Sequence, residues 1–262
     1  MQERYTNRRL YFEEQARTTE KFVIPYIESV KKIHKDMRIL EIGCGEAGNL
    51  KPFAKRHLQC TGVDLDKTRI NLANEFFGEM KNITTPQFIY KNMYDTSNKE
   101  LGEFDIIMMR DVIEHIPDQE KFLVFIKQFV KKDGIIFFGF PPWQMPFGGH
   151  QQIGENKWTR RAVYMHLLPM GMYKYLLKKF GEKKDRIEVM AEIKQTGISI
   201  ERFQRIIKAA GYKFDKKTYY FINPNYETKF KLKPRKKIPL IGDIPYIRNF
   251  ITTCMYAIMS KK

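Results

Sequence analysis

The chain is poor in cysteine and tryptophan. Its 262 residues include three cysteines and two tryptophans. Cys44, Cys60 and Cys254 are too widely spaced to form a metal-ligand motif or a disulfide framework. We therefore expect free thiols and no metal site.

Long hydrophobic runs are also missing. No stretch of about 18 apolar residues without charges occurs, so we expect no membrane-spanning helix. The chain begins Met-Gln-Glu-Arg, without the apolar segment that a signal peptide carries. Together with the few cysteines, these absences favour a cytoplasmic protein.

Acidic residues are outnumbered by basic ones, 30 to 47, which gives a net charge of +17. Six of the nine residues at 229–237 are basic, and five lysines fall within 174–184. Such an excess suits nucleic acid, an anionic membrane or an anionic small substrate, but it is equally typical of a solvated basic surface. Charge alone does not choose among these partners.

Three glycines follow a short apolar run at 39–42, and they are the most informative feature of the sequence. Gly43, Gly45 and Gly48 allow a tight turn at a strand end and let a ligand approach bare peptide groups. Their spacing satisfies the Gly-x-Gly-x-x-Gly dinucleotide pattern, and Asp64 stands where that pattern has an acidic residue. Spacing alone therefore admits a nicotinamide cofactor.

Two acidic residues argue for a different cofactor. Glu41 precedes the first glycine, and Glu46 lies in the turn where a pyrophosphate would contact a helix N-terminus. A negative side chain there opposes bound phosphate, because such anion sites depend on exposed N–H groups and the positive end of the helix dipole. S-adenosylmethionine (SAM) has no phosphate and carries a sulfonium and an ammonium group, so it fits these charges.

The segment resembles motif I of the class I SAM-dependent methyltransferases, written Asp/Glu-x-Gly-x-Gly-x-Gly. Ala47 stands at the third glycine with Gly48 after it, which we interpret as a tolerated variant. The resemblance implies methyl transfer from SAM, with S-adenosylhomocysteine as product. It also assigns cofactor contacts to this segment, namely Glu41, Gly43, Cys44, Gly45 and Gly48.

Further segments extend the resemblance, which covers roughly residues 36–141. In the family the acid after the second strand holds the ribose, which assigns Asp64 with its neighbour Leu65. The adenine position falls on Asn92 and Met93, with Asp95 as a competitor. The segment 104–118 resembles the signature after the fourth strand, where the residue at Arg110 offers its backbone near the methionine moiety.

Strand and helix patterns alternate between residues 38 and 140, which indicates βαβ units and a mainly parallel sheet. We predict a Rossmann-like, doubly wound α/β fold with a seven-stranded sheet and helices on both faces. The predicted strands are 38–42, 60–64, 87–90, 104–109, 134–140 and 212–221; the predicted helices are 5–33, bent at Pro25, 48–57, 67–77, 119–131 and 200–210.

Four regions follow from these patterns. We predict an N-terminal helical lid at 1–35, with Tyr5, Tyr11 and Phe12 over the cofactor, and a SAM-binding core at 36–141. A helical insertion after strand five, at 142–198, forms the substrate side. Residues 199–262 complete the sheet and end in a basic and apolar tail, which either rests on an anionic membrane or packs against the inserted helices.

The acceptor side should be the loop after the fifth strand, because ligands of open α/β sheets gather at the carboxyl ends of the strands. We predict that Trp143, Phe147, His150 and Gln151 contact the acceptor. His150 is our preferred general base, since a base helps most when the acceptor is a hydroxyl. His115 is a weaker catalytic candidate, because Glu114-His115 can equally be structural.

The first functional hypothesis is O-methylation of a sugar, glycan or related hydroxyl on a small or lipid-linked acceptor. An RNA methyltransferase is the alternative, supported by charge alone; nucleic acid is less favoured because Arg110-Asp111-Val112-Ile113 replaces an Asn-Pro-Pro-Tyr-like tetrad and no RNA-binding module is recognisable. A SAM-binding protein without turnover, or a NAD-binding module, is the third.

Overall fold

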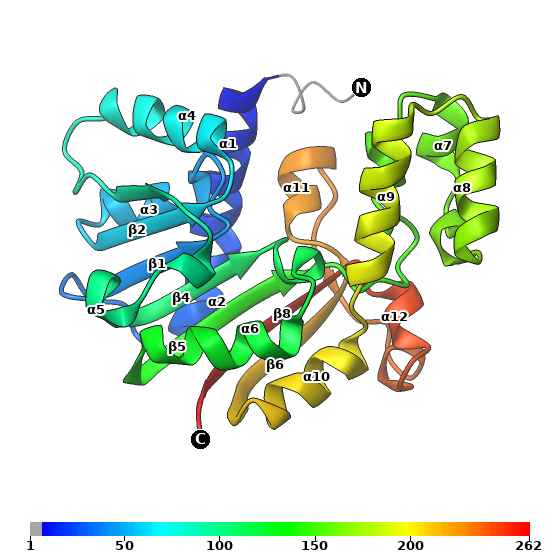
Figure 1. Ribbon diagram of the computed structural model, residues 1–262. Helices are drawn as coiled ribbons and strands as arrows, with labels where there is room; N and C mark the ends of the chain where they lie inside the picture. The colour runs from blue at the N-terminus through cyan, green and yellow to red at the C-terminus, as the bar shows by residue number, and fades with distance from the viewer. Residues whose placement is uncertain (1–6) are drawn as a thin grey trace.

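The computed structural model describes residues 7–262, and a single eight-stranded sheet organises them (Figure 1). The strand order is β3-β2-β1-β4-β5-β8-β6-β7. Strands β1 to β5 are parallel, whereas β8 runs antiparallel to both β5 and β6. The strands are β1 (Arg38–Ile42), β2 (Gln59–Asp64), β3 (Gln87–Tyr90), β4 (Phe104–Arg110), β5 (Val130–Phe140), β6 (Tyr212–Ile222), β7 (Arg235–Lys236) and β8 (Cys254–Lys261).

The predicted fold class is confirmed, with one strand more than the seven expected. The sequence placed six of those seven; the two strands that it did not place are β7, a two-residue edge strand that pairs with β6, and β8. The α-helices are α1 (Arg8–Thr18), α2 (Ile24–Glu28), α3 (Lys51–Lys55), α4 (Lys67–Gly78), α5 (Asn98–Leu101), α6 (Gln119–Ile126), α7 (Lys157–Arg161), α8 (Met170–Lys179), α9 (Lys184–Thr196), α10 (Ile200–Ala209), α11 (Asn225–Phe230) and α12 (Arg248–Ile251).

Alternate residues of the central strands supply two cores, one on each face of the sheet. Ile39 and Ile106 belong to the core that α1 to α4 cover, and Leu40 and Ile107 belong to the core that α6 and α10 cover. Both faces are buried, which explains why β1 and β4 read as continuous apolar runs. The sheet therefore presents its ligand-binding edge only at the carboxyl ends of β1 to β5.

The N-terminal helix is continuous but not uniform. A π-helical turn at Thr19–Val23 separates α1 from α2, and Pro25 lies in the first turn of α2. Proline lacks a backbone donor, so the widened turn just before it accommodates the missing bond. The bend predicted at Pro25 is thus a π-helical turn. Tyr5 lies outside the described residues.

Two predicted helices end too late. The N-terminal helix, predicted to reach residue 33, ends with α2 at Glu28. The helix predicted at 119–131 ends with α6 at Ile126, and a 3₁₀ turn (Lys127–Phe129) leads directly into β5, which begins at Val130 and not at residue 134. The C-terminal tail does not pack as a whole against the inserted helices, because residues Cys254–Lys261 form β8 in the interior of the sheet. Removing 229–262 would therefore delete an interior strand.

The region between β5 and α10 carries helices with a small core of their own. Met165, Tyr173, Leu177 and Met190 are buried there between α8, α9 and the 3₁₀ turn Met165–Leu167. Figure 1 shows this group projecting beyond the sheet, above α12. Within residues 7–262, no helix is long and apolar enough to cross a bilayer.

Candidate functional site

Two clefts open at the carboxyl edge of the sheet. The first, here called the apolar cleft, has a volume of about 200 Å³ and lies between the ends of β1, β2 and β3 and the segment after β4. Its lining is formed by Ile42, Gly43, Val63, Asp64, Leu65, Lys91, Asn92, Met93, Tyr94, Val112, His115, Ile116, Pro117 and Phe122. Five predicted cofactor residues, Gly43, Asp64, Leu65, Asn92 and Met93, are therefore brought together.

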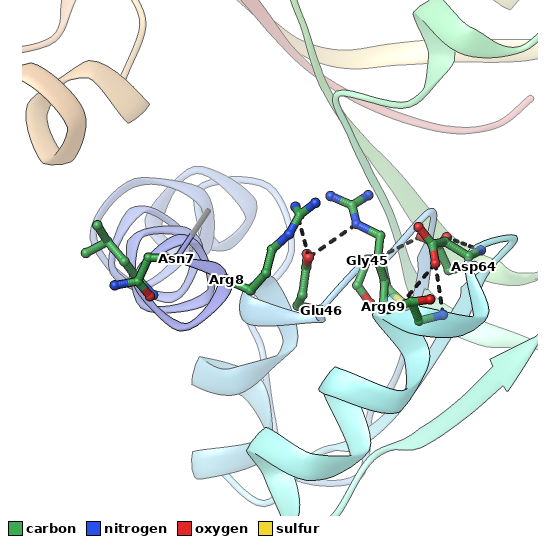
Figure 2. A network of polar contacts seen from close by, with 10 residues as sticks. Asn7, Arg8, Gly45, Glu46, Asp64 and Arg69 are labelled. Atoms are coloured by element: carbon green, nitrogen blue, oxygen red, sulfur yellow. Dashed lines mark hydrogen bonds and ion pairs between the residues drawn. The ribbon is translucent and has the colours of Figure 1, made fainter. Parts of the chain in front are cut away.

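The glycine turn holds the Asp64 carboxylate in place at one end of the apolar cleft. Gly43 and Gly45 have φ of 68° and 55°, a left-handed conformation that favours glycine. The Gly45 amide donates to Asp64 Oδ2 at 2.7 Å, and the Asp66 amide donates to Asp64 Oδ1 at 2.8 Å (Figure 2). Each carboxylate oxygen keeps a second lone pair, so Asp64 can still receive two hydroxyl groups. Asp66 itself caps α4.

Of the three residues predicted near the adenine, Asn92 and Met93 line the apolar cleft and Asp95 does not. The Asn92 side-chain oxygen accepts from the Tyr94 amide at 3.1 Å, which caps the 3₁₀ turn Met93–Asp95. Met93 is buried against the cleft, whereas Asp95 is not among the described residues that line it. The geometry favours Asn92 and Met93 over Asp95.

A buried polar network lies behind the glycine turn. Glu41 Oε1 accepts from Asn49 Nδ2 at 2.5 Å, and Arg110 Nη1 donates to Asn49 Oδ1 at 2.5 Å and to Thr19 Oγ1 at 3.2 Å. Burial raises the pKa of Glu41 to about 8. The Arg110 side chain therefore joins the π-helical turn to the glycine turn, and only its backbone remains for the predicted ligand contact.

Glu46 does not present a free negative charge. Its side chain is fully buried, and Oε1 pairs with Arg8 Nη1 at 3.2 Å and with Arg69 Nε at 3.3 Å (Figure 2). Two cations balance one carboxylate, so the reasoning that Glu46 repels phosphate is wrong. Neither arginine was predicted as a site residue, because nothing local in the sequence indicates that α1 and α4 meet over this turn.

The second cleft, here called the polar cleft, has a volume of about 380 Å³. Tyr11 and Arg8 from α1 line one side, so the predicted N-terminal lid borders the polar cleft and not the apolar cleft that holds the predicted cofactor residues. Phe12, predicted over the cofactor, is buried in the core instead. The remaining lining residues are Arg69, Asp111, Glu114, Pro141, Met145, Phe147, His150, Gln152, Ile153, Asn223, Asn225, Tyr226, Lys229 and Thr253. Phe147 and His150 were predicted here; Asp111, Asn223 and Lys229 were not.

The two clefts meet at a pair of histidines. His115 lines the apolar cleft, His150 lines the polar cleft, and their ring centroids are 5.1 Å apart. Glu114 lies beneath them, with Oε1 4.0 Å from His115 Nε2. Possible ligand atoms of Glu114, His115 and His150 all lie within 4.8 Å of one another, so these three residues could hold a metal ion. The prediction that the protein has no metal site stays a prediction.

Burial sets the charge state of this group. It raises the pKa of Glu114 well above its usual range, and both carboxylate oxygens lack a hydrogen-bond partner among the described residues. Burial, with His115, His166 and Lys229 nearby, lowers the pKa of His150 to about 3. His150 is therefore a neutral imidazole at neutral pH, able to accept a hydrogen bond but weakly basic.

Two residues predicted to contact the acceptor support the loop instead. Gln151 is fully buried and bonds His166 Nδ1 at 2.7 Å, while His166 Nε2 lies 2.8 Å from the Trp143 carbonyl oxygen. The Trp143 ring packs against His166 with centroids 4.5 Å apart. Neither Trp143 nor Gln151 is among the described residues that line the polar cleft. His166, which the sequence did not single out, is the centre of this support.

Comparisons with known proteins agree with this architecture. A family model described as a methyltransferase domain matches residues 11–181. The ubiquinone biosynthesis O-methyltransferase of Pelagibacter ubique is 30% identical over 111 residues, which are 42% of this chain and 45% of that protein. The chain thus spans less than half the length of this curated relative.

Two solved structures share the fold. The plantazolicin methyltransferase BpumL, in complex with a triazolic desmethylPZN analog and SAH, superposes with a TM-score of 0.58 at 13% identity, covering 99% of this chain and 89% of that one. Magnesium protoporphyrin IX methyltransferase (ChlM) from Synechocystis PCC 6803, with bound SAH, gives a TM-score of 0.55 at 10% identity, covering 95% and 84%.

The family model covers well over half of the chain. The resemblance to the family and the fold class predicted from the sequence are confirmed. The chain belongs to the methyltransferase-domain family of class I SAM-dependent methyltransferases.

Proposed function

We propose that this protein transfers a methyl group from SAM to a hydroxyl of a small or lipid-linked acceptor, such as a sugar or glycan intermediate. The observation that carries the proposal is the junction of the two clefts at Glu114, His115 and His150. Amines and thiols do not require a base, whereas a hydroxyl gains from one. A buried carboxyl group and two neutral imidazoles at the junction suit a hydroxyl acceptor.

Residues of the apolar cleft fit the cofactor. Asp64 has lone pairs left for the two ribose hydroxyls, and the Asn92–Met93 segment faces the place of the base. The sulfonium of SAM supplies an electrophilic methyl group. When bound, its positive charge would favour the ionised form of Glu114, whose two buried oxygens have no hydrogen-bond partner among the described residues.

The directions of the pKa shifts suggest a separate role for each residue at the junction. His150 accepts a hydrogen bond from the acceptor hydroxyl, and the proton passes to the His150–Glu114 pair as the new C–O bond forms and the C–S bond breaks. Glu114 takes up the proton because burial favours its protonated form, whereas burial lowers the pKa of His150 to about 3 and so keeps that ring unprotonated. His115 orients His150 by ring contact.

The RNA alternative has less support. The polar cleft is a hollow of about 380 Å³ that is lined on one side by the N-terminal helix, which suits a small group better than an extended strand. Arg8, Arg69 and Lys229 give it a positive lining, so an acceptor carrying phosphate or carboxylate fits the same cleft. A lipid-linked acceptor and contact with an anionic membrane remain proposals.

The first test measures binding by titration calorimetry with SAM and, separately, with NAD. SAM binding supports the proposal, and NAD binding without SAM binding would overturn it. Incubation with labelled SAM and fractionated extracts then shows whether label enters small molecules, lipid-linked glycans, RNA or protein. Label confined to RNA would favour the alternative.

The second test addresses the junction once an acceptor is in hand. We expect His150→Ala to lower kcat by about 100-fold or more, with the Kd for SAM within twofold of the parent. Glu114→Gln should lower kcat similarly. Unchanged turnover with intact SAM binding would rule out the base role. Loss of activity with a chelator, restored by a divalent cation, would instead make Glu114, His115 and His150 metal ligands.

A further inference from the structure

The segment 238–250 exposes a set of large apolar side chains that the core does not use. Leu240 is 83% exposed and Tyr246 is 70% exposed, values far above those of ordinary half-buried loop residues. The other exposed apolar members are Ile238, Ile241, Ile244, Ile247 and Phe250. We call residues 238–250 the apolar loop. Apolar side chains gathered in this way indicate an interaction surface.

The backbone of the apolar loop is fixed. Glu201 on α10 accepts from the Tyr246 amide at 3.0 Å and from Arg248 Nε at 2.9 Å. The Asn249 side chain closes the other side, with Oδ1 accepting from the Ile200 amide at 2.8 Å. Leu240 and Tyr246 hold φ of 65° and 64°, which costs free energy for a non-glycine residue and persists only where surrounding contacts impose it. The apolar side chains are thus displayed on a built scaffold.

Positive charge borders the apolar loop. Residues 229–237 carry six basic side chains, and 229–250 as a whole has seven basic residues and a single acidic one, Asp243. Arg235 and Lys236 form the exposed edge strand β7, and Lys237 pairs with Asp243, which joins the basic segment to the apolar loop. An apolar surface beside a basic one is complementary to the interface of an anionic bilayer.

This surface is continuous with the rim of the polar cleft. The chain lines the cleft at Lys229, leaves to form the basic segment and the apolar loop, and lines the cleft again at Thr253. Tyr164 makes a second connection: its hydroxyl donates to the Phe250 carbonyl at 3.2 Å, and its amide donates to the Pro146 carbonyl at 2.9 Å. Figure 1 shows α12 and the segment before it beneath α7 and α8.

We propose that residues 229–250 dock on an anionic lipid bilayer and hold the polar cleft beside the headgroup region. A second copy of the chain is a poorer occupant, because two strongly basic surfaces repel each other. Nucleic acid is poorer too, since it offers nothing to the exposed isoleucines and Leu240. The docking deepens the proposed function and rests on it in one respect. If the protein methylates a hydroxyl group, docking would make the acceptor lipid-linked, with its hydroxyl group reaching the polar cleft from the membrane.

Co-sedimentation of the full chain with vesicles tests the docking. We expect binding to phosphatidylcholine vesicles that contain phosphatidylglycerol, little binding to phosphatidylcholine alone, and release as ionic strength rises. Arg235→Gln with Lys236→Gln should lower the partition coefficient about 30-fold. Leu240→Asn with Tyr246→Asn should lower it about tenfold or more, and asparagine is among the residues that most readily adopt the positive φ found at both positions.

Matched controls keep the test specific. Lys32→Gln with Lys35→Gln removes the same charge elsewhere, and Val124→Ser removes an apolar side chain that is 59% exposed on α6. Both controls should bind vesicles like the parent, and all variants should keep the parent's Kd for SAM. Docking variants that bind as tightly as the parent would overturn the proposal. The proposal would also be overturned if the parent does not bind vesicles but forms a dimer in light scattering, and if Leu240→Asn with Tyr246→Asn makes that dimer dissociate.

The two proposals fail separately. Vesicle binding without methyl transfer to any fraction would leave the docking intact and refute the proposed reaction. Methyl transfer to a water-soluble acceptor by a chain that ignores anionic vesicles would refute the docking alone.

Discussion

Gly48→Ala probes the contact between the lid and the glycine turn. Gly48 has an ordinary backbone conformation, so alanine brings no strain of its own. Its Cβ would lie 2.3 Å from the Phe12 carbonyl oxygen and 2.9 Å from the Gln15 side chain. The Phe12 carbonyl would have to withdraw by at least about 0.7 Å to restore a 3.0 Å contact. Because that oxygen belongs to the backbone of α1, the whole helix must shift.

The expected cost follows from this close approach. Overpacking of a well-packed site costs about 1–3 kcal/mol, and the smaller backbone entropy of alanine in the unfolded chain returns about 0.4–1 kcal/mol. We expect a net loss of about 1–2 kcal/mol in the free energy of unfolding, measured by urea denaturation without ligand. Moving α1 also displaces Arg8 from Glu46 and Tyr11 from the polar cleft, so the KM for the acceptor should rise.

Gly78→Ala is the matched control. Nothing lies within 4 Å of the added Cβ, and Gly78 ends α4 without a left-handed backbone. The control should be neutral or more stable by up to about 1 kcal/mol. If Gly48→Ala proved as stable as Gly78→Ala, the packing of α1 directly on the glycine turn would be refuted.

Two further perturbations test the interior of the site. Burial raises the pKa of Glu41 from 4.5 to about 8, so between these pH values the folded state binds more protons than the unfolded state, and the free energy of unfolding falls as pH rises. Glu41→Gln should remove most of this fall, as measured by urea titrations from pH 5 to 9. An unchanged dependence of stability on pH would contradict the prediction. His166→Ala should lower kcat more than it raises the Kd for SAM, because His166 supports the loop that carries His150. A variant that loses SAM affinity and keeps kcat would show that His166 supports the cofactor site and not the loop of His150.

The parallel half of the fold was predictable because its signals are local. Strands β1 and β3 have the predicted bounds, since a short apolar run followed by glycine or a polar residue is enough to end a strand. The interior strand β8 was missed although Cys254–Met259 is an uninterrupted apolar run, because the prolines and charges just before it made the whole tail read as one surface segment. Its place is set by pairing with β5 and β6, which are far away in sequence.

The two clefts of the site also differ in how far the sequence predicts them. Gly43, Asp64, Asn92 and Met93 lie on consecutive strand ends, and parallel strands bring these ends to one edge whatever the rest of the chain does. The polar cleft combines Asp111 and Glu114, which follow the end of β4, with residues of α1, α4, the loop after β5 and α11, whose meeting depends on tertiary packing. No spacing in the sequence indicates that Lys229 would lie across a cleft from Tyr11.

The same packing changes the reason why this turn suits SAM and not a dinucleotide. Glu46 is balanced by Arg8 and Arg69, so its charge cannot exclude a pyrophosphate. We expect a steric exclusion instead, because the Phe12 carbonyl oxygen lies only 2.3 Å from the point that a Cβ on Gly48 would occupy and so fills the space beside the turn. A carbonyl oxygen is an acceptor with partial negative charge, so it also repels an anion there. Helix α1, which packs on the glycine turn, is thus the element that we expect to remove its phosphate site.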